Sequence, residues 1–102
     1  MILQDILYKV AIISVKGNTN IEVNNLQIDS RKIGAGHCFI AVKGAVANGH
    51  LFIETAIENG ATVIVCEDLP VVLKDTVTYI QVENTAVAAG LMSMGVCWAW
   101  VK

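Results

Sequence analysis

Two almost continuously apolar runs constrain the fold of this chain more than any other feature of its sequence. They extend from His37 to Val42 and from Ala61 to Cys66. Continuous apolarity over such a short length favours a strand covered on both faces, so we expect the first run to be central in its sheet. Between the runs, apolar residues recur at helical spacing from Phe52 to Ile57, and Asn59-Gly60 supplies a C-terminal cap. A helix, a glycine turn and an apolar strand form half of a parallel crossover unit.

Weaker patterns on either side extend this unit to one small α/β domain. We expect a helix over residues 2–9, strands over 10–15, 21–23, 26–28 and 77–82, and a closing helix from Thr85. A chain of 102 residues has room for a single domain with its own core. The predicted fold is therefore an α/β domain with a mixed, largely buried sheet flanked by helices.

The composition excludes several kinds of partner. Hydrophobic residues make up 55% of the chain and charged residues 16%, with a net charge of -2. The seven basic residues are scattered, so we expect no binding to nucleic acid or to an anionic membrane surface. The uncharged stretch from Ala86 to Val101 is short for a membrane span and contains two glycines, so no span is expected. The apolar excess instead indicates extensive burial or contact with a partner.

The cysteines and the N-terminus favour a cytoplasmic protein. The three cysteines, Cys38, Cys66 and Cys97, lie outside any Cys-x-x-Cys pattern, which fits a reduced compartment better than a disulfide framework or a zinc site. We expect them to be buried small apolar residues. The N-terminus also lacks the basic stretch, apolar core and small-residue cleavage site of an export signal.

The first candidate site is Asp29-Ser30-Arg31, where a predicted strand gives way to a loop with two glycines. Ligands of open α/β sheets bind outside strand ends. A serine hydroxyl, the free N–H groups of a tight turn and the planar donor fork of Arg31 would together suit a diphosphate. The alternative is a self-contained turn, in which Asp29 accepts hydrogen bonds from its own backbone and Arg31 is solvated.

The second candidate site is the loop from Lys43 to His50, which follows the first apolar run. Its glycines, Gly44 and Gly49, allow close backbone approach to a flat ligand, and a helix N-terminus near His50 would favour anions. The alternative is an ordinary connection in which Asn48 caps the helix. His50 could be a base, a ligand contact or a capping residue, and we favour the last.

The sequence lacks the motifs of an independent active site. It has no Gly-x-x-x-x-Gly-Lys-[Ser/Thr] phosphate loop, dinucleotide fingerprint, His-Glu-x-x-His or Gly-x-Ser-x-Gly. It also lacks a paired Cys and His and a dense carboxylate cluster for a metal. We therefore expect neither catalytic residues nor metal ligands in the chain.

Taken in order, a series of short segments resembles the N-terminal domain of Mur ligases, the ATP-dependent enzymes that add amino acids to UDP-N-acetylmuramoyl peptides. The resemblance covers residues 1–90. The segments are Leu3-Gln4-Asp5-Ile6-Leu7, Val15-Lys16-Gly17-Asn18-Thr19, Ile28-Asp29-Ser30-Arg31-Lys32, Gly36, Phe39-Ile40-Ala41-Val42-Lys43-Gly44, Asn48-Gly49-His50, Phe52-Ile53, Ala56-Ile57 and Gly60-Ala61. Within the family they are most similar to the ligase that adds the third residue, diaminopimelate or lysine, and the ligase that adds D-alanyl-D-alanine is the alternative.

The resemblance implies a role in peptidoglycan synthesis, and so in cell-wall biogenesis, cell shape and cell division, with this domain holding the UDP part of UDP-N-acetylmuramoyl-L-alanyl-D-glutamate. The implied substrate-binding residues are Ile28, Ser30, Arg31, Ala45, Val46, Ala47 and Asn48, and the implied turn-shaping residues are Asp29, Gly44 and Gly49. ATP and magnesium are implied for the full-length enzyme, which has central and C-terminal domains. The chain itself is expected to hold no cofactor and to be inactive alone.

The end of the chain departs from the family pattern. Residues 91–102 run into an apolar tail where the family continues to its phosphate loop, which suggests a truncation or a shifted reading frame. A different class of function also stays open, an interaction module that associates with itself through residues 86–101. The predicted division is thus a UDP-substrate-binding domain over residues 1–90 and an atypical tail over 91–102.

Overall fold

A computed structural model describes residues 2–7, 10–42 and 48–94 of the chain. Its centre is a five-stranded sheet in the order β1-β5-β4-β3-β2. The strands are β1 (Ile12–Lys16), β2 (Asn25–Gln27), β3 (His37–Ile40), β4 (Val63–Cys66) and β5 (Thr78–Val82). Strands β2 to β5 run parallel, and β1 pairs antiparallel with β5 at one edge. The predicted mixed sheet is confirmed.

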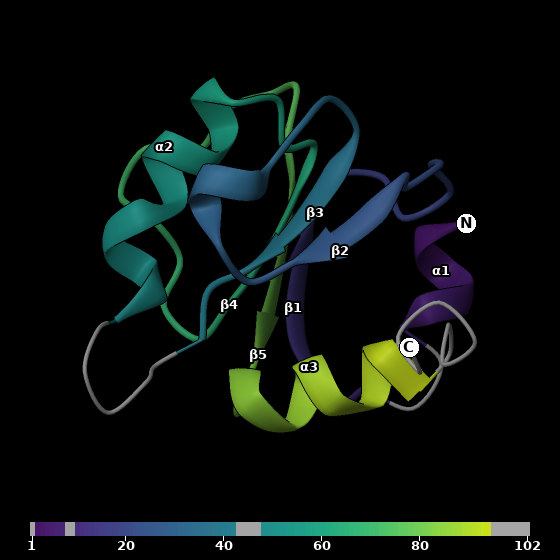
Figure 1. The fold of residues 1–102 in the computed structure, drawn as a ribbon. Coiled ribbons are helices and arrows are strands. Elements are labelled where there is room, and N and C mark those ends of the chain that lie inside the picture. The colour runs from purple at the N-terminus through teal and green to yellow at the C-terminus, as the bar shows by residue number, and fades with distance from the viewer. Residues whose placement is uncertain (1, 8–9, 43–47, 95–102) are drawn as a thin grey trace.

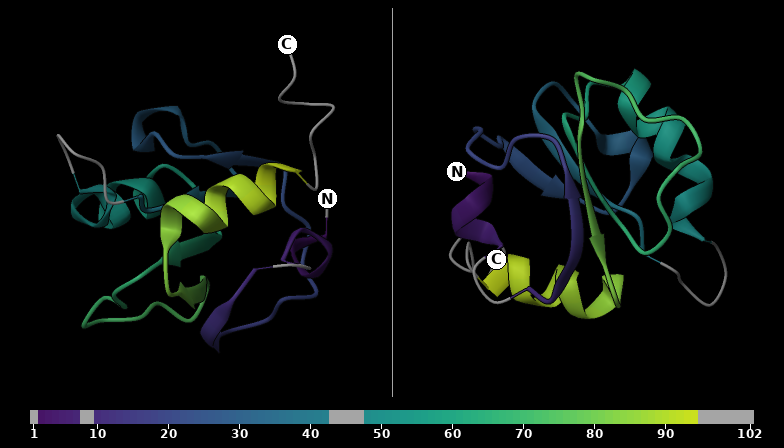
Figure 2. Two further views of the ribbon diagram at one scale, coloured as in Figure 1. Left: turned by 90° about the horizontal axis from the view of Figure 1, so that it is seen from below. Right: turned by 180° about the vertical axis from the view of Figure 1, so that it is seen from behind.

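Helices cover both faces of this sheet (Figure 1). Helix α2 (Ile53–Glu58) lies on one face, and α1 (Leu3–Ile6) and α3 (Thr85–Met94) lie on the other. Figure 2 shows that the end of α3 lies near α1. Two short 3-10 helices, η1 (Ser30–Lys32) and η2 (Gly49–Phe52), follow the loops after β2 and β3. The predicted α/β architecture is therefore the observed one.

The core explains why the strand runs are apolar throughout. Along β4, Val63 and Val65 face the cluster beneath α1 and α3, whereas Ile64 and Cys66 face the cluster beneath α2. All four side chains are buried, because successive side chains of a strand point to opposite faces and both faces are covered. In the strand order, β4 is the middle strand of the five. Strand β3 lies between β2 and β4, so the prediction that it is central was off by one position.

The strand predicted over residues 21–23 is absent, and the reason is its contact with α1. The N–H of Leu3 donates to the carbonyl of Ile21 at 2.9 Å, and that of Gln4 donates to the carbonyl of Thr19 at 3.0 Å. An isolated bridge between Ile2 and Glu22 completes this contact. The segment therefore pairs with the chain around α1 instead of extending the sheet. Of the helix predicted over residues 2–9, only Leu3–Ile6 is helical among the described residues.

The edge strand β1 and the next strand β5 have opposite burial. Every residue of β1 is exposed or half-buried, whereas four of the five positions in β5 are buried. The side chains of β5 are buried on both faces, because Ile80 and Val82 lie in the cluster beneath α1 and α3 and Tyr79 lies in the cluster beneath α2.

Two of the predictions about cysteines and the chain end can be compared with the structure. Cys38 and Cys66 are buried as expected, and burial raises the pKa of their thiols to about 12 and about 11.

Helix α3 continues through residue 90 to Met94. Cys97 and residues 95–102, which include most of the predicted tail, lie outside the described residues. Within the described part of the chain, none of the helices has the length and apolarity needed to cross a bilayer.

Candidate functional site

The candidate site lies at the carboxyl edge of the parallel strands. Strand β2 is followed by the turn at Asp29-Ser30-Arg31, and its neighbour β3 is followed by the loop that ends at Asn48. Because adjacent parallel strands end at the same edge of a sheet, both predicted segments begin there. The next strand, β4, contributes Glu67 and Asp68 to the same edge.

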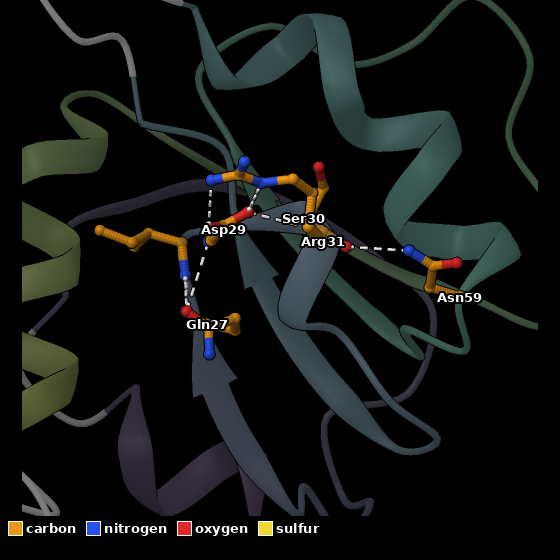
Figure 3. Close-up of polar contacts among 6 residues, drawn as sticks. Gln27, Asp29, Ser30, Arg31 and Asn59 are labelled. Carbon is orange, nitrogen blue, oxygen red and sulfur yellow. Dashed lines mark hydrogen bonds and ion pairs between the residues drawn. The ribbon is translucent and has the colours of Figure 1, made fainter.

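The first turn is held by the carboxylate of Asp29 (Figure 3). Its Oδ1 accepts hydrogen bonds from the backbone N–H and the Nε–H of Arg31, both at 3.0 Å. Its Oδ2 accepts from Nη2 of Arg31 at 2.9 Å. These bonds lower the pKa of Asp29 to about 2 and raise that of Arg31. The turn is thus ordered by charge-assisted bonds made entirely within it.

Arg31 is ordered by these bonds but still faces solvent. Its side chain is 86% exposed, and one edge of its guanidinium is occupied by Asp29. The sequence suggested that the whole donor fork was available to a phosphate. In the structure, Nε and one donor of Nη2 bond to Asp29, so the donors available to a phosphate are those on Nη1 and the second donor on Nη2.

Ser30 connects the turn to helix α2. The residue is buried at 6% exposure, and its carbonyl accepts a hydrogen bond from Nδ2 of Asn59 at 2.9 Å (Figure 3). Asn59 lies at the end of α2, next to Gly60, whose φ of +114° ends the helix. The Ser30 hydroxyl makes no hydrogen bond to any other described residue. It is therefore a polar group held in place through its backbone, with its side chain still able to bind.

Ile28 adds an apolar surface beside this turn. Its side chain is 61% exposed, although it directly follows β2. Its backbone N–H donates to Oε1 of Gln27 at 3.2 Å, and the same oxygen accepts from the N–H of Asp29. An exposed isoleucine on a chain segment fixed in this way can pack against a flat or apolar part of a ligand.

The second turn begins with an amide in place of the carboxylate. Oδ1 of Asn48 accepts from the backbone N–H of His50 at 3.0 Å and lies 2.8 Å from its Nδ1. The N–H of Gly49 donates to the carbonyl of Val42 at 2.9 Å, which joins the two ends of the loop. A Cβ on Gly49 would lie 2.8 Å from the nitrogen of Val42, so no side chain fits there. The predicted site residues Gly44, Ala45, Val46 and Ala47 lie outside the described part of the chain.

His50 has a role that sequence reasoning missed. Asn48 supplies the helix cap, whereas Nε2 of His50 accepts from the N–H of Glu67 at 2.9 Å and from that of Asp68 at 3.2 Å. The ring therefore joins the second turn to the end of β4. These partners lie 17 and 18 residues away along the chain, and no local pattern marks such a contact.

No group of three His, Cys, Asp or Glu side chains gathers within the described ranges. The full sequence also lacks a phosphate loop. Phosphate chemistry at this edge would thus depend on Arg31 and on backbone and side-chain amides.

Comparison with known proteins finds one family. A model described as "Mur ligase family, catalytic domain" matches residues 22–94. The UDP-N-acetylmuramoyl-L-alanyl-D-glutamate–2,6-diaminopimelate ligase of Bacteroides fragilis is 43% identical over 90 residues, which cover 88% of this chain and 19% of that protein. The ligase of the same name from Cytophaga hutchinsonii is 44% identical over 94 residues, covering 91% and 19%. The chain therefore spans about one fifth of the length of these relatives.

Solved structures of MurF ligases have the same fold as this chain. A structure of MurF from Acinetobacter baumannii superposes with a TM-score of 0.74 at 21% identity, over 91% of this chain and 20% of that one. MurF from Thermotoga maritima, solved with ADP, gives 0.59 at 30% identity, over 68% and 16%. The sequence relatives are named as diaminopimelate ligases and these structures are named as MurF, so this chain shares its sequence with the first group and its fold with the second.

Proposed function

The chain belongs to the Mur ligase family and corresponds to its N-terminal domain, and from this premise we propose that it binds the uridine diphosphate part of UDP-N-acetylmuramoyl-L-alanyl-D-glutamate. The relatives that share 43% and 44% identity favour third-residue addition over D-alanyl-D-alanine addition. The proposed division keeps residues 1–90 as the binding unit and 91–102 as a tail.

One observation carries the proposal: polar donors with no partner in the described structure stand on a rigid turn at the carboxyl edge. The outward donors of Arg31 suit a diphosphate, since guanidinium and phosphate are matched in geometry. The Ser30 hydroxyl suits an acceptor oxygen of the nucleotide, and exposed Ile28 suits the apolar face of uracil or ribose. Asn48 would close the site from the neighbouring loop, together with backbone groups of residues 45–47.

The remaining chemistry of such a ligase is assigned outside these residues. Because the sequence lacks a phosphate loop, we propose that ATP, magnesium and the amino-acid substrate bind to the central and C-terminal domains of a full-length enzyme. The chain then acts as a substrate-binding part without turnover of its own. We also propose a cytoplasmic location, which suits a substrate made from nucleotides.

A two-dimensional NMR titration with UDP tests this function. We expect shifts at the amides of Ile28, Ser30, Arg31, Asn48 and Gly49, and no general shift across β4. Uridine is the matched control, because it lacks the diphosphate and should move the Ile28 region more than Arg31. A folded sample whose spectrum does not change at millimolar UDP would rule the function out for this chain.

A charge-matched pair of variants isolates the role of Arg31. Arg31→Gln removes a guanidinium proposed to bind phosphate, whereas Lys32→Gln removes an exposed charge from the same 3-10 turn. We expect the first to weaken UDP binding about tenfold, the loss of roughly one charge-assisted hydrogen bond. The second should change it less than about threefold, as screened surface charges do. Equal losses in both variants would mean that only net charge attracts the ligand.

A further inference from the structure

We propose that His50, as its neutral Nδ1–H tautomer, is a positioning residue that fixes Asn48 in the nucleotide site by tethering it to the end of β4. The inference rests on the proposed function, because it assigns His50 a role in that same site. It adds a residue that touches no ligand itself and acts through Asn48.

The partners of the ring determine its tautomer. Nε2 faces the backbone N–H groups of Glu67 and Asp68, which can only donate, so Nε2 carries no proton. Nδ1 faces Oδ1 of Asn48 at 2.8 Å, which can only accept, so Nδ1 carries the proton. Both ring nitrogens are thus assigned by their neighbours, and an imidazolium would direct an N–H against two others.

The same contacts fix the orientation of the Asn48 side chain. Its Oδ1 accepts from the backbone N–H of His50 and from the ring, which excludes the flipped amide because two donors would then face each other. The amide nitrogen Nδ2 therefore points away from His50 and bonds to no other described residue. Its donors are those we assign to oxygen atoms of the nucleotide.

The far end of the tether is itself held firmly. The carbonyl of Glu67 accepts from Nε2 of Gln81 at 3.0 Å. The Glu67 carboxylate accepts from the N–H and Oγ1–H of Thr85, at 2.9 and 3.0 Å, at the start of α3. His50 is thus joined to a strand end that β5 and α3 both restrain, which gives Asn48 a rigid anchor across the sheet edge.

The charged groups around the ring define how the tether responds to pH. Glu54 of α2 and Asp68 line a cavity together with His50, and Lys74 pairs with Glu54 at 3.8 Å. The carboxylate of Glu67 is turned to Thr85. An imidazolium cannot accept from the two backbone N–H groups, so protonation of the ring would break the bonds to β4 and release Asn48.

The first test reads the tautomer directly from the imidazole ¹⁵N chemical shifts at pH 7.5. We expect a pyrrole-like Nδ1 and a pyridine-like Nε2 for His50, with His37 as the internal reference. The opposite tautomer or an imidazolium at this pH would overturn the tether.

The second test measures binding of UDP-N-acetylglucosamine, whose diphosphate is a diester and does not titrate between pH 5 and 8 as the terminal phosphate of UDP does. We expect His50→Ala to weaken binding about tenfold. His50→Gln, whose Oε1 can accept near the position of Nε2, should restore it to within about threefold. A folded His50→Ala variant that binds as tightly as wild type would overturn the inference.

The third test measures the pH dependence of binding in the wild-type protein, so it does not depend on whether a variant folds. Its affinity for UDP-N-acetylglucosamine should fall as His50 protonates, in step with the amide shifts of Glu67 and Asp68. Constant affinity across that titration would overturn the positioning role. If wild type binds no UDP compound at any pH, the proposed function fails, whereas the ¹⁵N spectrum still decides whether the tether exists.

Discussion

The two turns at the sheet edge share a local design and differ in what they connect. In Asp29-Ser30-Arg31 and in Asn48-Gly49-His50, the first side chain accepts a 3.0 Å hydrogen bond from the N–H two residues on. In both, the side chain of the third residue also bonds back to the first. The side chain of Arg31 bonds only to Asp29 among the described residues and is 86% exposed, whereas the ring of His50 also accepts a hydrogen bond from the end of β4 through Nε2.

The difference teaches how a shared local motif can serve two purposes. The first turn is ordered mainly by side-chain bonds within it, with one hydrogen bond from Asn59 to the Ser30 carbonyl, and it presents charge to solvent, which suits direct contact with an anionic ligand. The second is ordered by the fold and presents an amide of fixed orientation. The middle residues agree with this division. Ser30 carries a side chain, whereas a Cβ on Gly49 would collide with the backbone of Ala41 and Val42.

The largest effect is expected at that middle position. In Gly49→Ala, the new Cβ would lie 2.8 Å from the nitrogen of Val42 and 3.0 Å from two backbone atoms of Ala41. Backbone cannot move aside as a side chain can, so we expect a loss of about 1–3 kcal/mol in the free energy of unfolding, measured with urea.

Gly90→Ala is the matched control for this prediction. Nothing lies within 4 Å of a Cβ at Gly90, which is inside α3. Alanine there should raise stability by about 0.5–1 kcal/mol through helix propensity. If the two variants were equally stable, the second turn would not need the close backbone approach, and its contrast with the first would disappear.

A smaller effect separates the two capping side chains. Asn48→Ala removes the cap and also the partner of the His50 ring, so it should cost about 1–2 kcal/mol in urea unfolding. Asp29→Ala removes bonds that are made within one exposed turn and are screened by solvent, so its loss should be smaller. A larger loss in Asp29→Ala would reverse the proposed division between the turns.

The smallest effect is the acid response of the first turn. Because the pKa of Asp29 lies near 2 in the folded chain, below its value in the unfolded chain, its contribution to stability is complete above about pH 4 and is lost as the pH falls toward 2. The ¹³C shift of the carboxyl group should titrate near 2 in wild type and at a higher pH in Arg31→Gln, which loses the side-chain bonds but keeps the bond from the backbone N–H of residue 31. An unchanged titration in the variant would show that Arg31 does not hold the carboxylate.

Much of the fold could be predicted because local patterns carry it. The runs His37–Val42 and Ala61–Cys66 contain β3 and β4, and helical spacing with Asn59-Gly60 marks α2 and its end. The segment at 21–23 was predicted wrongly for a physical reason. Its apolar alternation is that of a strand, and Val23 is indeed buried, but its hydrogen-bonding partner is the start of α1.

The sequence alone determined the fold class, the two candidate segments and the turn-forming role open to Asp29 and Asn48, because each depends on neighbours within a few residues. Only the tertiary structure decided which strand is central, how much of the Arg31 guanidinium remains available, and that His50 bonds to Glu67 and Asp68. Those features depend on groups brought together by packing. A histidine's role follows from what faces its two nitrogens, and chain order does not record that.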